Sequence, residues 1–417
     1  MTHNLEGLGV ERDFNLGNTV LNITDLKKED AKPPIFRLAF RPFFLFGSLF
    51  SVVAILLWAL FLNNPNLGLQ PYGGWFWWHG HEMLFGFGWA IIVGFLLTAV
   101  QNWSGLPGLS GWPLATLFLL WLAGRLFMFF PVIPHTYIAI IDVLFLPIAA
   151  LILCKPVIAA KLWRNLMFIP LLLLLSWANG YSHFRLLQGD SFSLPETQST
   201  ILIITMIILV MGGRVIPFFT ANALSLKKPE PILILELFSI VPLILVVFYS
   251  LFSREISPAL TLGILLLITA LANAIRFGRW HAKLTISTPL LWSLHVSYLL
   301  IILSIGMLSL FHFGLSLPLS TILHGLTIGG MGLMILAMVS RVSLGHTGRP
   351  LKVGKLISFS YLLLIIATIL RVATPLFTNQ TMNGYLISAI CWIIAYSLFV
   401  CIYWPVLTTP RVDGRPG

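Results

Sequence analysis

Long apolar runs, separated by short polar stretches rich in proline and glycine, dominate the chain from residue 38 to residue 405. A helix needs about 20 apolar residues to cross the ~30 Å hydrocarbon layer of a bilayer. The runs are continuous rather than alternating, which excludes a membrane β-barrel. The pattern predicts an all-α membrane bundle with twelve transmembrane helices, over residues 38–62, 76–100, 111–130, 136–154, 164–187, 198–220, 231–252, 257–277, 288–310, 318–343, 354–373 and 384–405.

The two ends of the chain differ from this apolar region. Residues 1–34 are polar, carry both signs of charge and lack the apolar segment of a signal peptide, so they are expected to form a flexible cytoplasmic tail. Residues 35–410 are expected to form a single helical membrane domain, and residues 411–417 a short C-terminal tail. Because the connections are short, any chemistry is expected inside the membrane.

The charges fix an expected orientation. Only 9% of the residues are charged, against about 25% in an average soluble domain. With the N-terminus in the cytoplasm, 19 lysines and arginines fall on the inner side and 3 on the outer side. This asymmetry predicts that both termini are cytoplasmic. It also explains the net charge of +11 by contact with the anionic face of the lipid bilayer, without nucleic acid.

Ionisable residues inside a membrane are costly, and they are usually paired or functional. Arg125 and Asp142 lie at matching depths near the outer ends of the third and fourth spans, and Arg214 and Glu236 near the inner ends of the sixth and seventh. Both pairs are predicted to be buried ion pairs that join neighbouring helices. The alternative for Arg214 is binding of an anion such as a cofactor carboxylate.

Four histidines fall at similar depth near the outer face: His79 and His81 in the second span, His183 in the fifth and His324 in the tenth. Imidazole is a ligand for copper, zinc and iron, so at least two of them are predicted to bind metal. The alternative is hydrogen-bonded packing. Residues i and i+2 project about 200° apart on a helix. His79 and His81 therefore serve different partners, unless the helix begins between them.

Further polar residues could support such a site. Glu82 shares a helix face with His79 and is expected to orient it, although an acid in the first turn is also favoured by the helix dipole. His295 and Tyr298 share a face deeper in the ninth span, where they could hold a second metal or relay protons. The cysteines show no CxxC spacing and are interpreted as small buried hydrophobes.

Glycines follow two of the histidines. Gly86, Gly88 and Gly94 come after His81, and a similar set of three comes after His324. Such glycines admit either a neighbouring helix or the flat face of a macrocycle. The two segments echo each other at an offset of 243 residues, which is weak evidence for repeated helix groups.

Several motifs resemble the NnrS family, which comprises bacterial membrane proteins of the nitric-oxide response described as binding haem and copper. The motifs are "FRLAFRPFFLFG" (36–47), "WHGHEMLFGFGWAIIVGFLLTAVQNWSG" (78–105), "GRVIPFFT" (213–220), "LHVSY" (294–298) and "HGLTIGGMGLMILAMVSRVSLGHTGRPL" (324–351). The resemblance implies a multi-pass protein of the inner membrane with b-type haem, copper and nitric oxide as its cofactors and ligand. It carries over to His79, His81, Glu82, Arg214, His295, Tyr298, His324, Arg341, His346 and Arg349.

The resemblance does not say which histidine takes which metal. Two axial imidazoles must approach a haem from opposite faces at similar depth, which favours His79 or His81 with His324. The segment with Arg341, His346 and Arg349 lies at the inner edge, where it could meet haem propionates or simply form a glycine-capped helix end with a proline stop. A membrane transporter, or an assembly factor that handles metal or haem through intramembrane histidines and arginines, is the alternative function.

Overall fold

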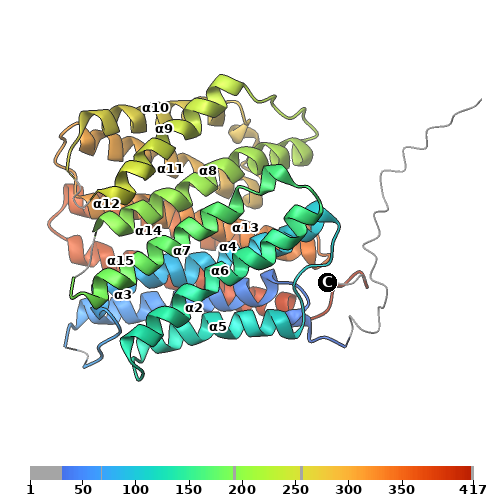
Figure 1. The fold of residues 1–417 in the computed structure, drawn as a ribbon. Helices are drawn as coiled ribbons and strands as arrows, with labels where there is room; N and C mark the ends of the chain where they lie inside the picture. Colours follow the sequence, from blue (N-terminus) through green and yellow to red (C-terminus); the bar gives the residue numbers. More distant parts are fainter. Residues whose placement is uncertain (1–30, 67, 191–193, 254–256, 415–417) are drawn as a thin grey trace, which may run out of the picture.

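The computed structural model describes residues 31–66, 68–190, 194–253 and 257–414, and every element in these ranges is a helix. Most of the predicted tail, residues 1–34, lies outside the described residues. Helices cover all twelve predicted spans and run alongside one another (Figure 1). Eleven helical segments in the described part are long and apolar enough to cross a bilayer. The remaining one, α7 (Phe168–Leu187), carries buried polar residues that interrupt its apolar run.

The helices fall into three groups of four, and a short 3₁₀ turn opens each group. These turns are η1 (Pro34–Phe36), η3 (Trp163–Asn165) and η4 (Ala282–Thr285). The first group is α2 (Phe40–Asn63), the composite α3 (Gly74–His81), η2 (Glu82–Gly88) and α4 (Trp89–Ser104), then α5 (Trp112–Phe129) and α6 (His135–Ala159). The second is α7, α8 (Leu194–Leu224), α9 (Leu233–Phe252) and α10 (Leu260–Gly278). The third is α11 (Pro289–His312), the composite α12 (Leu319–His324), η5 (Gly325–Gly332) and α13 (Leu333–His346), then α14 (Lys355–Phe377) and α15 (Thr381–Thr408).

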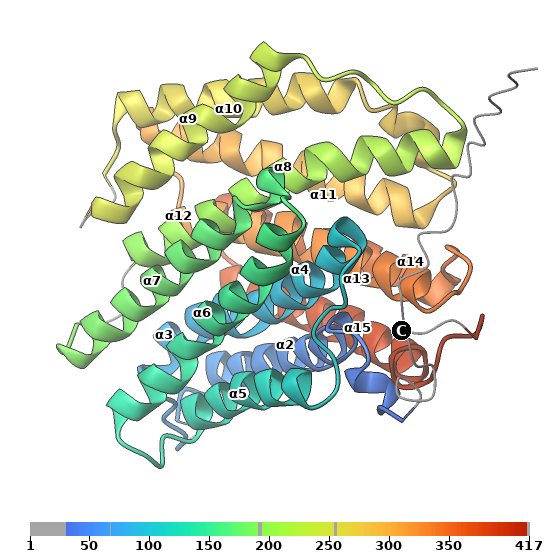
Figure 2. The same ribbon diagram turned by 45° about the vertical axis from the view of Figure 1, so that its right-hand side comes forward.

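The three groups close into a ring. The last helix of each group packs along the first helix of the next: α6 on α7, α10 on α11, and α15 on α2. Figure 2 shows this closure between the two ends of the chain, where α15 lies beside α2. The echo in the sequence has a structural counterpart, because η2 and η5 are both π-helical and begin 243 residues apart, at Glu82 and Gly325.

The two π-helical segments follow His81 and His324 directly. Single π turns are rare and often lie at functional sites; the apolar pattern does not distinguish them from α-helix. Their glycines are needed for close packing. A Cβ on Gly86 would lie 2.6 Å from Nη1 of Arg125, and one on Gly332 would collide with the ring of Trp392. At these two positions, neighbouring side chains rather than a macrocycle fill the space beside the glycine.

We expect Gly332→Ala to destabilise the bundle, because overpacking a close-packed site costs about 1–3 kcal/mol. Gly306→Ala is the matched control: Gly306 is also helical, but nothing lies within 4 Å of the position that a Cβ would take there. Thermal unfolding in detergent should show a lower midpoint for Gly332→Ala and an equal or higher midpoint for Gly306→Ala. Equal midpoints for the two variants would contradict the packing role.

Candidate metal centre

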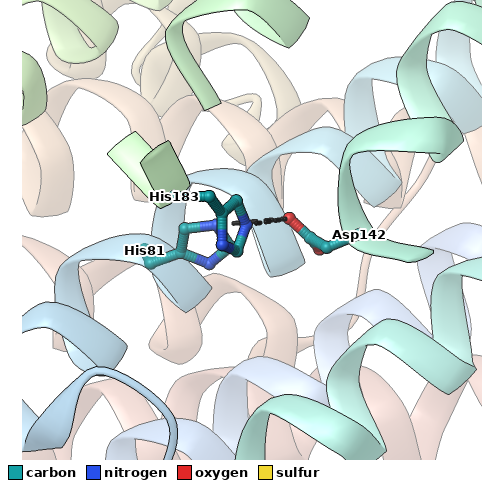
Figure 3. Close-up of side chains that lie close together, drawn as sticks. All are labelled: His81, Asp142 and His183. Atoms are coloured by element: carbon teal, nitrogen blue, oxygen red, sulfur yellow. Dashed lines mark hydrogen bonds and ion pairs between the residues drawn. The ribbon is translucent and has the colours of Figure 1, made fainter. Parts of the chain in front are cut away.

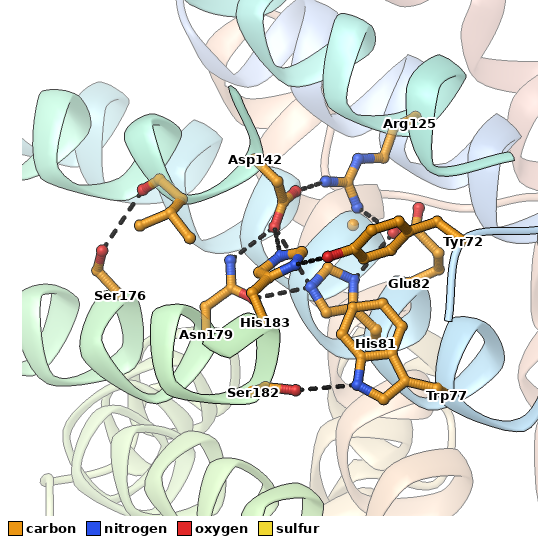
Figure 4. Close-up of polar contacts among 12 residues, drawn as sticks. Tyr72, Trp77, His81, Glu82, Arg125, Asp142, Ser176, Asn179, Ser182 and His183 are labelled. Carbon is orange, nitrogen blue, oxygen red and sulfur yellow. Dashed lines mark hydrogen bonds and ion pairs between the residues drawn. The ribbon is translucent and has the colours of Figure 1, made fainter. Parts of the chain in front are cut away.

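A polar cluster lies at one end of the bundle, where α3, α6 and α12 begin and α7 ends. Three of these helices, α3, α6 and α7, supply its side chains. This end is called the His81 end, and it lies at the left in Figure 1. His81 closes α3, Asp142 lies on α6, and Asn179 and His183 lie one turn apart on α7, which places them on the same helix face. Each of these four side chains is at least nine-tenths buried, although all four are polar: two are imidazole rings, one is an amide and one is a carboxylate (Figure 4).

Both histidine rings turn Nε2 toward the same carboxylate oxygen (Figure 3). Nε2 of His81 lies 3.3 Å from Oδ2 of Asp142, and Nε2 of His183 lies 3.2 Å from it. A tetrahedral metal with bonds of about 2.0–2.1 Å separates its ligand atoms by about 3.3–3.4 Å. Both distances to Oδ2 of Asp142 match this spacing, and the ligand atoms of the three residues all lie within 4.8 Å of one another. Among the described residues, no other group of three such side chains is close enough to share a metal.

The other nitrogen of each ring has a partner on the far side. Nδ1 of His81 lies 3.0 Å from Oε1 of Glu82, and Nδ1 of His183 lies 3.1 Å from the hydroxyl of Tyr72. Metal-binding histidines usually donate this second N–H to a carboxylate or another acceptor, which fixes the tautomer. With both Nδ1 atoms donating outward, both Nε2 lone pairs point into the space beside Asp142.

A neutral His81 cannot satisfy its surroundings alone, because its two nitrogens both face acceptor oxygens. Glu82 faces Nδ1, while Nε2 lies 2.7 Å from Oδ1 of Asn179 and close to Asp142. Neutral imidazole has one N–H, so one lone pair always faces an oxygen. The carboxylates of Glu82 and Asp142 also outnumber the guanidinium of Arg125 by one charge. A cation at Nε2 of His81, either a proton or a metal ion, removes both conflicts.

Arg125 holds the two carboxylates in place. Its Nη1 donates to Oε1 of Glu82 at 2.6 Å, and its Nη2 pairs with Oδ1 of Asp142. The predicted pair of Arg125 and Asp142 is confirmed, but it is part of the polar centre rather than a separate link between helices. The expectation that Glu82 orients His79 is wrong, because the carboxylate contacts His81 instead.

The second predicted ion pair is wrong. Glu236 on α9 pairs with Arg276 of α10, with 2.9 Å between Oε2 and Nη2, and not with Arg214. Arg276 extends from the next helix toward α9, and a Cβ on Gly213 would collide with its guanidinium. Within the part of the chain that the structure describes, Arg214 makes no ion pair.

His79 and His324 form a second pair on the other side of α3. Their ring centroids are 6.4 Å apart and their planes differ by 10°. Nδ1 of His79 and Nη1 of Arg371 are buried without a hydrogen-bond partner, and Nη2 of Arg371 lies 3.4 Å from Nε2 of His324. The predicted histidine layer is therefore two sites, divided between the two sides of α3.

Comparison with known proteins identifies the family of the chain. A family model described as NnrS protein matches residues 34–411, which include every transmembrane helix. The chain belongs to the NnrS family. No curated protein matches it. The family assignment and the helices together establish a multi-pass membrane protein.

The other residues carried over from the NnrS motifs lie apart from these two sites. Nε2 of His295 contacts Thr220 at 3.0 Å, whereas Tyr298 donates to Asn273 at 2.5 Å and receives a hydrogen bond from Arg276. His295 and Tyr298 thus have different hydrogen-bond partners, although both rings pack against Phe277 and Trp280.

The last group of motif residues, Arg341, His346 and Arg349, lies toward the end of the bundle opposite His324. His346 follows His324 by 22 residues, or about 33 Å along the helix at ~1.5 Å per residue. Arg341 lies 3.8 Å from the ring centroid of Phe219, and Arg349 donates to Thr409. These three residues are too distant to serve the propionates of a haem held by His324.

We expect Arg125→Leu to lower the free energy of unfolding by about 3–5 kcal/mol, because it leaves two buried carboxylates without their cation. The double variant with Asp142→Leu should not recover this loss, since Glu82 remains unpaired with Arg125. Adding Glu82→Leu should recover much of it. Thermal unfolding in detergent measures the series.

The control is Arg185→Leu, which removes partly exposed ion pairs with Asp190 and Glu196 and should cost only about 0–1 kcal/mol per pair. Full recovery in the double variant would show that Glu82 does not depend on Arg125.

Proposed function

We propose that this NnrS-family protein binds copper at His81, Asp142 and His183 and b-type haem between His79 and His324, and that it acts in the nitric-oxide response from the bacterial inner membrane. The family assignment supports a membrane protein of that response. The single observation that carries the copper site is the convergence of two Nε2 atoms on one oxygen of Asp142, with both Nδ1 atoms held from outside.

Copper suits this donor set. Imidazole nitrogens bind copper well, and Cu²⁺ forms the most stable complexes of the divalent first-row metals with a given nitrogen and oxygen site. Bound copper would supply one-electron redox chemistry next to a small neutral ligand. Three protein ligands would leave further coordination positions on the copper. Beside these positions, the amide of Asn179 bridges His81 and Asp142, and its Nδ2 donates to Oδ2 of Asp142 at 2.6 Å.

The residues of the chain would bind, orient and enclose the metal. Glu82 and Tyr72 accept the outward N–H groups and so keep the Nε2 lone pairs available. Arg125 neutralises one of the two carboxylate charges, which leaves one negative charge to attract a cation. The indole of Trp77 stacks on His81 with 4.4 Å between ring centroids and excludes water from that face. Nitric oxide is small and uncharged, so it can enter such a site from hydrocarbon.

His79 and His324 would supply the axial ligands of the haem. The two rings belong to different helices, and their centroids lie 6.4 Å apart. Arg371 lies beside them with a buried, unpartnered Nη1, and its guanidinium would pair with a haem carboxylate. Because the two imidazoles would occupy both free positions of its iron, the haem would supply one-electron redox chemistry rather than a binding site for a diatomic ligand.

A crossed pair of variants tests this assignment. His81→Ala and His183→Ala should each lose about one copper per chain and keep the Soret band, because their ligands belong to the copper site alone. His324→Ala should lose the Soret band and keep the copper. Metal analysis and absorption spectra of purified protein measure both, and His135→Ala, an exposed histidine at the same end, is the control that should change neither.

Two results would contradict the proposal. A folded wild-type protein without copper and without a Soret band would overturn it entirely. Loss of both metals in every histidine variant, the control included, would show general unfolding rather than two separate sites.

A further inference from the structure

A polar cavity lies near the copper site, between α7, α8 and α9 at the His81 end. Its volume is about 280 Å³, and its lining includes Tyr181, Arg185, Glu196, Ser199 and Ser250. A volume of this size holds several water molecules when the walls offer hydrogen-bonding groups. The hydroxyls of Ser199 and Ser250 lie 2.8 Å apart, one on α8 and one on α9. A polar cavity of this size at the ends of three membrane helices needs an explanation.

A much smaller void continues from this cavity to the metal centre. It measures about 10 Å³, roughly the space for one water molecule, and it is lined by His81, Trp77 and Ser182 among others. Ala178 and Glu196 line both spaces. The carboxyl-bearing side chain of Glu196 therefore stands between the wide cavity and the ring of His81.

The charges along this route favour a cation. Glu196 pairs with Nη1 of Arg185 at 3.2 Å, and Nε of the same arginine contacts Asp190 at 2.5 Å. Among the described residues, the mouth thus carries one more carboxylate than guanidinium groups, and the centre around Asp142 has the same excess. Low-dielectric walls focus such a field and raise the local concentration of counter-ions. An anion would be repelled, and an uncharged gas needs no polar route.

We propose that the cavity between α7, α8 and α9 is the route by which a metal cation reaches the buried centre from the outer aqueous phase, with Glu196 as the transfer ligand. The cation would exchange water for the carboxylate oxygens of Glu196 and then for the Nε2 lone pair of His81. The proposal rests on the proposed copper site, and it adds the path and the residue that set the rate of loading.

Metal uptake by the stripped protein tests the route separately from the site. Purified full-length protein in detergent is freed of metal with a chelator, mixed with Cu²⁺, and desalted after fixed times for metal analysis. Glu196→Gln removes the transfer charge, and Ser250→Trp fills the cavity. Both should slow uptake by about tenfold or more and reach the same final copper content as the wild type. Raising the salt concentration should slow the wild type and have little effect on Glu196→Gln.

Glu230→Gln is the control, because Glu230 is an exposed acid at the opposite end of the bundle that does not line the cavity. Its uptake rate should stay within about twofold of the wild type. Wild-type rates in both Glu196→Gln and Ser250→Trp would overturn the route while leaving the copper site intact. Final copper that does not depend on His81 and His183 would instead overturn the site, and the route with it.

Discussion

The buried carboxylate of Asp142 is the constraint on which the centre depends. A carboxylate in a membrane interior must be neutralised or hydrogen-bonded, because low dielectric makes an isolated charge very costly. Here Arg125, Asn179, His81 and His183 all contact it. The same carboxylate therefore joins α3, α5, α6 and α7 and sets where two imidazole lone pairs meet. A cation bound at Asp142 would stabilise the folded state, so metal binding and folding would be coupled.

The ring of three helix groups explains how two sites lie so close together. α3, which belongs to the first group, contacts α6 and α7 through His81 and α12 of the third group through His79. Because the helix continues through His79 to His81, the two rings project in different directions. One joins Asp142 and His183, and the other faces His324. A single turn of helix thus serves two centres, and Glu82, the first residue of the π-helical segment that follows, contacts the ring of His81.

Much of this arrangement can be predicted from the sequence, for physical reasons that can be named. The twelve spans follow from the length of hydrocarbon that each must cross, and the separation of His79 from His81 follows from helical periodicity. The pair of Arg125 and Asp142 follows from matching depths in a hairpin. The partner of Glu236 cannot be predicted in this way, because Arg214 and Arg276 lie at similar depth and the packing of the helices decides which of them forms the ion pair. The sequence gives no sign that Tyr72 and Arg371 belong to the two sites. Tyr72 lies in a loop, and Arg371 lies near the end of a helix, where a solvated arginine is ordinary. Asn179 and His183 carry a recognisable signal, two polar residues at i and i+4 on an apolar helix, although only the histidine stands out as a metal ligand.

The position of the metal itself tests the proposed centre most directly. A structure of the copper-loaded protein, with anomalous scattering measured at the copper absorption edge, locates the ion without reference to any variant. We predict one peak within about 2.0–2.2 Å of Nε2 of His81, Nε2 of His183 and Oδ2 of Asp142. A fully loaded protein whose copper peak lies elsewhere, or in which Asp142 keeps Asn179 and Arg125 as its partners and contacts no metal, would contradict the assignment.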